Sequence, residues 1–325
     1  MTNVHIRGWG KYLPQQILSN DDIGNLIGTS AEWISPRTGI VERRIAAKDE
    51  TVAKMSVKAA QDALCLAQAN PNDVDLIIVA TITPDRVVPA TACFVQDVLG
   101  CRAAAFDLSA GCSGFIYALS VATKMIEGQL ARNALVIGAE AHSHILDWTD
   151  FNTCPLLGDG AGAFYLEASP APGGLLAFEL GADGSGGKFL TGPTVGGGYI
   201  PAIAPDLSEK YLTMNGKAVY RFATRIMGSI TEIALCKAGL ILDDLSLLIP
   251  HQANLRIIEA AASHLKLPME KVYVNLDRYG NTSSASIPIA CCEAITEERL
   301  ASGDLVAMVG FGAGYTWGAA IARWP

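Results

Sequence analysis

Length, composition and charge restrict the classes of protein to which this chain can belong. It has 325 residues, of which half are hydrophobic and 17% are charged, and its formal net charge is −8. This is enough apolar material for one large domain or for two of ordinary size. The acidic balance argues against a nucleic-acid-binding protein, which needs a basic face, and against attachment to anionic lipid by overall charge.

Targeting and metal-binding patterns give further exclusions. The first residues, "MTNVHIRGWGKYLP", do not form a basic segment followed by the apolar core of a signal peptide. The longest apolar runs are strand-sized, well below the ~20 residues that cross a bilayer. The eight cysteines form no C-x-x-C pair and no Cys/His cluster with zinc-ligand spacing. We therefore expect a cytoplasmic protein with no membrane association and no metal site, in which most cysteines are reduced and buried.

Helix-like and strand-like segments alternate through the first half of the chain. Residues 51–69 and 113–129 read as helices, the second with an apolar face at helical spacing. Short apolar runs at 74–82, 103–108 and 133–141 predict buried strands. This alternation predicts a mostly parallel sheet with helices on both faces.

The second half repeats this plan. Strand-like runs at 245–254, 272–276 and 305–314 follow those of the first half at offsets of 168 to 171 residues. An offset of about half the chain length predicts a duplication, in which two similar α/β halves pack together. We place the halves at 1–172 and 173–325, with the boundary in "SPAPGG".

The remaining segments predict turns, a loop and one long helix. The Gly-rich runs 158–164 and 310–318 predict turns, and 185–206, rich in Gly and Pro, predicts a loop. Residues 217–240 have apolar side chains at helical spacing and predict a helix with Arg221 on its more polar side.

Cys112 is the strongest candidate for a chemical role. It lies in "FDLSAGCSGF", directly after a predicted strand and at the expected start of a helix. Unpaired N–H groups and the helix dipole favour a thiolate at such a position, and the small neighbours leave room for a substrate. The same small residues also suit a closely packed strand-to-helix corner with no chemical function.

His251 and Asn281 are the other two candidates. His251 ends a predicted buried strand. At such a position a histidine is about as often a hydrogen-bonded core residue as a functional one. Asn281 opens a predicted helix, where Asn most often serves as a cap or turn residue. Asn281 lies 169 residues after Cys112, which matches the repeat offset, so both are expected at corresponding corners of one cleft. We interpret the other histidines as structural: His5, His142, His144 and His264.

A thiol, an imidazole and a carboxamide suit carbanion chemistry better than hydrolysis. The thiolate attacks an acyl thioester and holds the acyl group. His251 Nε2 and Asn281 Nδ2 then donate hydrogen bonds to the carbonyl oxygen of a second thioester and stabilise the enolate formed when it loses CO₂.

Six motifs spread over the chain resemble those of β-ketoacyl-acyl carrier protein synthase III, a family of the thiolase superfamily. The resemblance runs in register from about residue 4 to residue 323 and so covers nearly the whole chain. The motifs are "TSAEWISPRTGIVERRIA", "FDLSAGCSGFIYAL", "GDGAGA", "LIPHQANLRII", "DRYGNTSSASIP" and "FGAGYTWG".

This resemblance implies an α/β fold, the thiolase-like five-layered αβαβα duplication, and a homodimer. It implies the condensation of a short acyl-CoA primer with malonyl-acyl carrier protein, without a cofactor because CoA thioester is a substrate. Cys112 is then the acylated nucleophile, and His251 and Asn281 are the decarboxylation pair. The backbone N–H groups of Cys112 and Gly312 form the oxyanion hole, and Phe311 shapes the site near the sulfur.

The resemblance also assigns residues that hold the two substrates. Trp33 stacks on adenine, and Arg37 and Thr38 contact the nucleotide. Arg221 and Arg256 form a basic patch at the tunnel mouth, where acidic carrier protein docks. The residues that line the pantetheine tunnel are Met214, Gly216, Ala253 and Asn254.

The chain departs from the family pattern at two positions. Phe151 stands where many members have an arginine that faces Trp33 across the adenine, so that cation is lost. Val88 stands where some relatives have Phe at the far end of the tunnel, and we expect this to enlarge the primer pocket. The resemblance implies that Val88, Leu157 and Phe311 line that pocket.

Three other functions remain open at the level of sequence. One is an acyltransferase or condensing enzyme of a specialised pathway with the same Cys-His-Asn site and a different acceptor or longer primer. Another is a nucleotide-dependent oxidoreductase that uses "GDGAGAF" as a phosphate loop, although no acidic residue at the right distance supports it. The last is a non-catalytic subunit of this fold, against which Cys112 argues.

Overall fold

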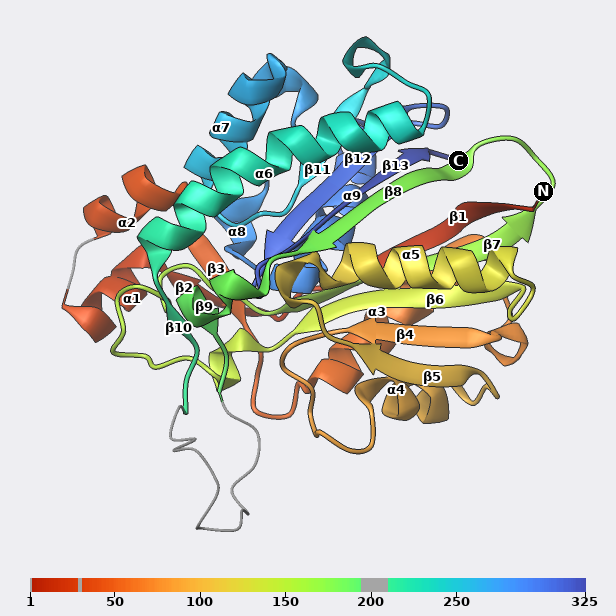
Figure 1. The fold of residues 1–325 in the computed structure, drawn as a ribbon. Helices are drawn as coiled ribbons and strands as arrows, with labels where there is room; N and C mark the ends of the chain where they lie inside the picture. Colours follow the sequence, from red (N-terminus) through yellow and green to blue (C-terminus); the bar gives the residue numbers. More distant parts are fainter. Residues whose placement is uncertain (1, 29–30, 194–209) are drawn as a thin grey trace.

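The computed structural model describes residues 2–28, 31–193 and 210–325. Two sheets and three layers of helices alternate through the molecule (Figure 1). The strands are β1 (Asn3–Tyr12), β2 (Gln16–Ser19), β3 (Glu42–Ile45), β4 (Leu76–Ala80), β5 (Ala104–Leu108), β6 (Asn133–Glu140), β7 (Gly160–Ser169), β8 (Gly174–Ala182), β9 (Leu190–Thr191), β10 (Thr213–Met214), β11 (Leu247–Pro250), β12 (Leu305–Gly312) and β13 (Thr316–Arg323). The α-helices are α1 (Asn20–Ile27), α2 (Ala31–Thr38), α3 (Val52–Ala67), α4 (Thr91–Leu99), α5 (Gly114–Glu127), α6 (Gly216–Lys237), α7 (Leu255–Leu265), α8 (Leu276–Tyr279) and α9 (Ser286–Thr296).

The two large sheets have the same strand order and the same strand directions. The first runs β1-β7-β6-β4-β5. In it β7 is antiparallel to both β1 and β6, and β4 is parallel to both β6 and β5. The second runs β8-β13-β12-β11. In it β13 is antiparallel to both β8 and β12, and β12 is parallel to β11. The parallel bridge between Leu248 and Val272 stands where β5 stands in the first sheet. The shared strand order of the two sheets is therefore the structural form of the predicted repeat.

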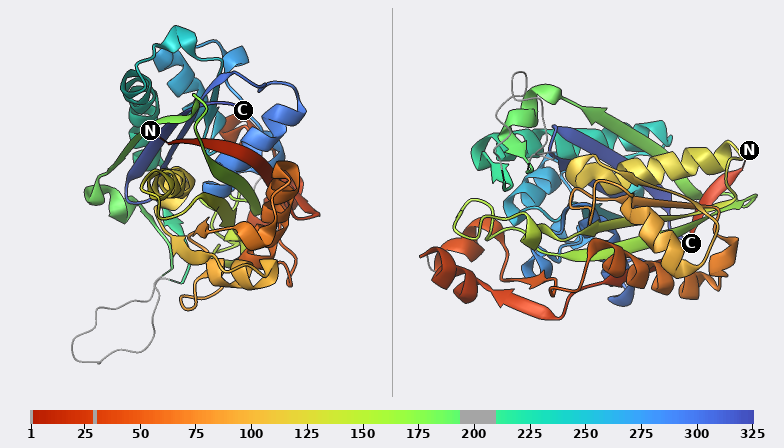
Figure 2. Two further views of the ribbon diagram at one scale, coloured as in Figure 1. Left: turned by 90° about the vertical axis from the view of Figure 1, so that its right-hand side faces the viewer. Right: turned by 90° about the horizontal axis from the view of Figure 1, so that it is seen from below.

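The central layer of helices holds the two sheets together. Phe115 of α5 and Ile287 of α9 are fully buried in one cluster with side chains of both sheets. Helices α3 and α4 cover the outer face of the first sheet, and α6 and α7 cover that of the second. This is the αβαβα order that we expected. Both termini lie at one end of the molecule (Figure 2).

Most sequence-predicted elements are confirmed within a few residues, and two are wrong. Of the turn predicted at 310–318, only residues 313–315 lie outside β12 and β13. Residues 272–276 form only the isolated bridge at Val272, because the chain turns into α8 at Leu276. Residues 158–164 lie mostly in β7 and not in a turn. A Cβ at Gly162 would lie 2.8 Å from Pro288 Cβ, so this glycine lets α9 pack closely on the sheet. Because no helix follows this run directly, it cannot act as the phosphate loop of an oxidoreductase.

The structure describes only part of the predicted loop, and it does not test the predicted boundary between the halves. The predicted loop 185–206 begins with a short 3-10 helix, Gly184–Phe189, and β9, and from residue 194 onward it lies outside the described residues. The first sheet ends with β7 at Ser169, and β8 of the second sheet begins at Gly174. The division into 1–172 and 173–325 itself stays a prediction.

Candidate active site

Cys112, His251 and Asn281 line one cavity of about 140 Å³, which we call the middle cavity. Cys112 follows β5 and lies in the short 3-10 helix Gly111–Ser113 that leads into α5. His251 follows β11, and Asn281 follows α8, so both come from the second half of the chain. The structure therefore brings together three residues that are far apart in the sequence.

Close backbone contact with β12 fixes the turn that carries Cys112. Gly111 has a φ of +58°, which favours glycine, and a Cβ there would lie 2.7 Å from Ala313 N. A Cβ at Gly312 would lie 2.3 Å from Cys112 N. Any side chain at Gly312 would therefore displace the nucleophile candidate.

The surroundings of Cys112 oppose the thiolate that the start of a helix favours. The residue is partly accessible and lines two cavities. Burial raises the pKa of Cys112 to about 12, and the nearby Glu140 carboxylate adds to the effect, while a hydrogen bond with Ser283 opposes it. The side chain is a thiol near neutral pH.

His251 is buried and neutral. Burial, with a smaller contribution from His142, lowers the pKa of His251 to about 3. Its Nδ1 lies 2.7 Å from Ser286 Oγ, which leaves Nε2 for the middle cavity. The ring of Phe311 packs edge-on against it at 5.5 Å between ring centres.

The orientation of the Asn281 carboxamide follows from its hydrogen bond. The backbone N–H of Ser283 donates to Asn281 Oδ1 at 2.8 Å, and only the amide oxygen can accept it. The Nδ2 group is therefore left as a donor. Backbone hydrogen bonds to Leu156 and Gly158 hold Asn281 against the loop that precedes β7.

Glu140, to which the sequence assigned no role, lies behind this site. Its side chain is fully buried at the end of β6 and accepts hydrogen bonds from both halves of the molecule. A signal was present, because it is an acidic residue at the end of an otherwise apolar run. The donors are the hydroxyl groups of Thr81, Thr83, Ser283 and Ser284 and the backbone N–H of Ile82.

Two further cavities adjoin the middle one. An outer cavity of about 1110 Å³ shares Leu156, Met214 and Gly216 with the middle cavity. An inner cavity of about 60 Å³ shares Cys112, Leu156, Leu190, Met214 and Asn281 with it. The three cavities thus lead from the surface past Cys112 into the interior.

The residues predicted to bind the two substrates gather along this path. The middle cavity also contains Ala253, Phe311 and Gly312. The hydroxyl group of Thr38 lies at the outer cavity but is engaged by the backbone of Ile34 and Ile40. The outer cavity is lined by Trp33, Arg37, Thr38, Phe151, Met214, Gly216, Asn254, Arg221 and Arg256, among others.

Three side chains form the part of the outer cavity where adenine was expected. The guanidinium carbon of Arg37 lies 4.8 Å from the centre of the Trp33 ring. Phe151 meets the same indole edge-on at 5.8 Å, and it is half exposed. Arg37 thus supplies a cation beside Trp33 although position 151 is aromatic.

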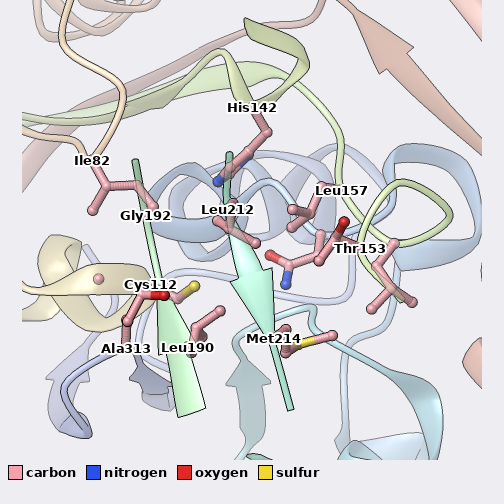
Figure 3. A pocket seen from close by; sticks show the side chains of 14 residues that line it. Ile82, Cys112, His142, Thr153, Leu157, Leu190, Gly192, Leu212, Met214 and Ala313 are labelled. Carbon is pink, nitrogen blue, oxygen red and sulfur yellow. The ribbon is translucent and has the colours of Figure 1, made fainter. Parts of the chain in front are cut away.

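The inner cavity contains one predicted residue and one that the sequence analysis treated as structural. Leu157 lines this cavity, as does His142, together with Cys112 (Figure 3). Val88 does not: it is 80% exposed and lies outside the three cavities. In the single chain the side chain of Val88 faces solvent, and the expectation that it enlarges the primer pocket stays a prediction.

Within residues 2–28, 31–193 and 210–325, no group of three or more His, Cys, Asp or Glu side chains is arranged to hold a metal ion. No helix in these ranges is long and apolar enough to span a bilayer.

The two repeated sheets, the central helix layer and the cavity lined by Cys112, His251 and Asn281 define a thiolase-like enzyme. Family models described as 3-oxoacyl-[acyl-carrier-protein (ACP)] synthase III and its C-terminal part match residues 106–184 and 235–324. The chain belongs to the β-ketoacyl-[acyl-carrier-protein] synthase III family, whose members are acyltransferases.

Individual relatives match over almost their full lengths. The β-ketoacyl-[acyl-carrier-protein] synthase III of Roseiflexus castenholzii is 49% identical over 98% of this chain and 97% of its own. The Desulfitobacterium hafniense enzyme of the same name is 50% identical over 100% of this chain and 98% of its own. The Thermus thermophilus crystal structure has a TM-score of 0.93 with 46% identity, and the match covers 99% of both chains.

Proposed function

We propose that this enzyme condenses a short acyl-CoA primer with malonyl-acyl carrier protein and so initiates fatty-acid synthesis. The observation that carries the proposal is the middle cavity, where the Cys112 thiol, the His251 ring and the Asn281 carboxamide share one wall. A simple acyl transfer needs no second pair of donors, whereas a decarboxylative condensation does.

The first step transfers the primer to the enzyme. Cys112 Sγ attacks the thioester carbonyl, the bond between the acyl carbon and the CoA sulfur breaks, and the thiol proton leaves with CoA as CoA-SH. Because burial raises the pKa of Cys112 to about 12, the thiol proton is transferred during the attack, to the departing CoA sulfur, and not before it. The backbone N–H groups of Cys112 and Gly312 serve as the oxyanion hole, in keeping with the contact of Gly312 with Cys112 N.

The second step forms the carbon–carbon bond. Malonyl-carrier protein loses CO₂, and the electron pair of the broken bond forms an enolate at the thioester. His251 Nε2 and Asn281 Nδ2 donate hydrogen bonds to the enolate oxygen. The neutral ring favoured by the low pKa of His251, and the fixed orientation of Asn281, support this role. The enolate carbon attacks the acyl carbon, the bond between that carbon and Cys112 Sγ breaks, and the released thiolate takes a proton from solvent.

The outer cavity receives the carriers of both thioesters. Trp33, Arg37 and Phe151 bind the nucleotide end of CoA, and Thr38 contributes to this wall. Arg221 and Arg256 at the rim attract the acidic carrier protein, and salt weakens this attraction. Met214, Gly216, Ala253 and Asn254 enclose the pantetheine arm. We place the enzyme in the cytoplasm as a homodimer.

Intact-protein mass measurement after mixing with acetyl-CoA tests this proposal. We expect a covalent acyl adduct that is lost in Cys112→Ser. His251→Ala and Asn281→Ala should retain acylation and lose decarboxylation of malonyl-carrier protein by at least about 100-fold. An equal loss of both steps in these two variants would overturn the division of roles.

A further inference from the structure

His142 is a buried histidine in the wall of the inner cavity. It is 1% exposed and begins the short 3-10 helix His142–His144, directly after β6. Figure 3 shows its ring extending toward the space between Leu212 and Cys112. The mechanism proposed above gives this side chain no role.

One hydrogen bond fixes the ring. His142 Nδ1 lies 3.0 Å from the backbone oxygen of Gly158. A carbonyl oxygen only accepts, so Nδ1 carries the proton and donates. Nε2 is then the atom that remains, and among the described residues it has no hydrogen-bond partner. Nε2 is therefore a polar atom at the cavity.

The two threonine side chains that line the inner cavity are already engaged, Thr191 with the hydroxyl group of Thr213 at 2.7 Å. The hydroxyl group of Thr153 donates to Asp150 at 2.8 Å. Asn281 accepts from Ser283 through Oδ1 and keeps Nδ2 for the thioester oxygen. Much of the remaining lining is apolar: Ile82, Leu156, Leu157, Leu190, Leu212 and Met214.

We infer that His142 is a specificity-determining residue that restricts the primer to short acyl groups, an inference that rests on the proposed function. Cys112 lines the inner cavity, so an acyl group on its sulfur has this cavity beside it. A short group leaves space for water at Nε2. A longer apolar chain removes that water and offers no hydrogen bond in return, which is costly for a buried polar atom.

A competition between two primers measures this selectivity. The enzyme is mixed with equal concentrations of acetyl-CoA and hexanoyl-CoA, and intact-protein mass gives the ratio of hexanoyl to acetyl adduct at early times. We expect His142→Leu to raise this ratio by about tenfold, because an apolar side chain removes the desolvation cost. His142→Met provides a second apolar variant if the first does not fold, and His142→Gln, which keeps a polar end, should stay near the wild-type ratio.

The matched control is His144→Leu, the same change on the same short helix at an exposed position. A ratio that stays within twofold of wild type in both apolar variants, or that rises equally in His144→Leu, would overturn the inference. Failure of the proposed function would look different, because the wild-type enzyme would then form no adduct from either primer.

Discussion

Hydrogen bonds to neighbouring residues fix the orientation of the polar side chains at the site. Glu140 illustrates this, because its carboxylate accepts hydrogen bonds from Ser283 and Ser284 of one half and from Thr83 of the other. Ser283 in turn orients Asn281 through its backbone N–H. The positions of the candidate catalytic groups thus depend on residues that touch no substrate.

Position 151 allows a test at the residue scale. Phe151→Arg should lower the dissociation constant for CoA by about two- to fivefold, because a second cation beside Trp33 adds an exposed cation–π contact. Isothermal titration of CoA measures the change. The control is Leu130→Arg, which adds the same charge at a position that is 79% exposed and outside the cavities. Equal gains in the two variants would show that only the net charge matters.

At the scale of elements, glycines set the distances between neighbouring segments. Gly162 allows α9 to lie on β7, and Gly312 allows β12 to touch the turn that carries Cys112. Both positions lie in Gly-rich runs that the sequence predicted as turns, 158–164 and 310–318. The structure places them within strands, where the missing side chain matters more than backbone freedom.

Gly312→Ala tests the contact between β12 and the Cys112 turn. The added Cβ would lie 2.3 Å from Cys112 N, so the backbone must shift. We expect the rate of acyl-enzyme formation to fall by at least about 100-fold and the free energy of unfolding to fall by about 1–3 kcal/mol. Stopped-flow acylation and urea denaturation measure the two effects. Gly184→Ala is the control, because nothing lies within 4 Å of a Cβ there, and a similar loss in that variant would contradict the explanation.

At the scale of the whole molecule, duplication places a cleft between two similar halves. Cys112 comes from one half, and His251 and Asn281 come from the other. Burial of His251 in this cleft also links folding to pH. Its pKa of about 3 in the folded protein lies below the value of about 6.5 for an exposed histidine, so folding favours the neutral ring.

This burial predicts a loss of stability on acidification. The contribution is fully present above about pH 6.5 and is lost progressively as the pH falls toward 3. Between pH 7.5 and pH 5, His251 should account for about 2 kcal/mol of lost unfolding free energy. Urea denaturation of the wild type and of His251→Asn at both pH values gives this difference. Identical pH dependence in the two proteins would rule out a buried neutral histidine.

The sequence by itself determined the strand and helix pattern, the repeat and the three candidate catalytic residues. These follow from local periodicity and from the spacing of Cys112, His251 and Asn281, which a linear chain records. Only the tertiary structure decided that the surroundings of Cys112 raise the pKa of its thiol, that Val88 is exposed in the single chain and that His142 lines the inner cavity. Burial and hydrogen-bond partners come from segments distant in sequence, so no local pattern contains them.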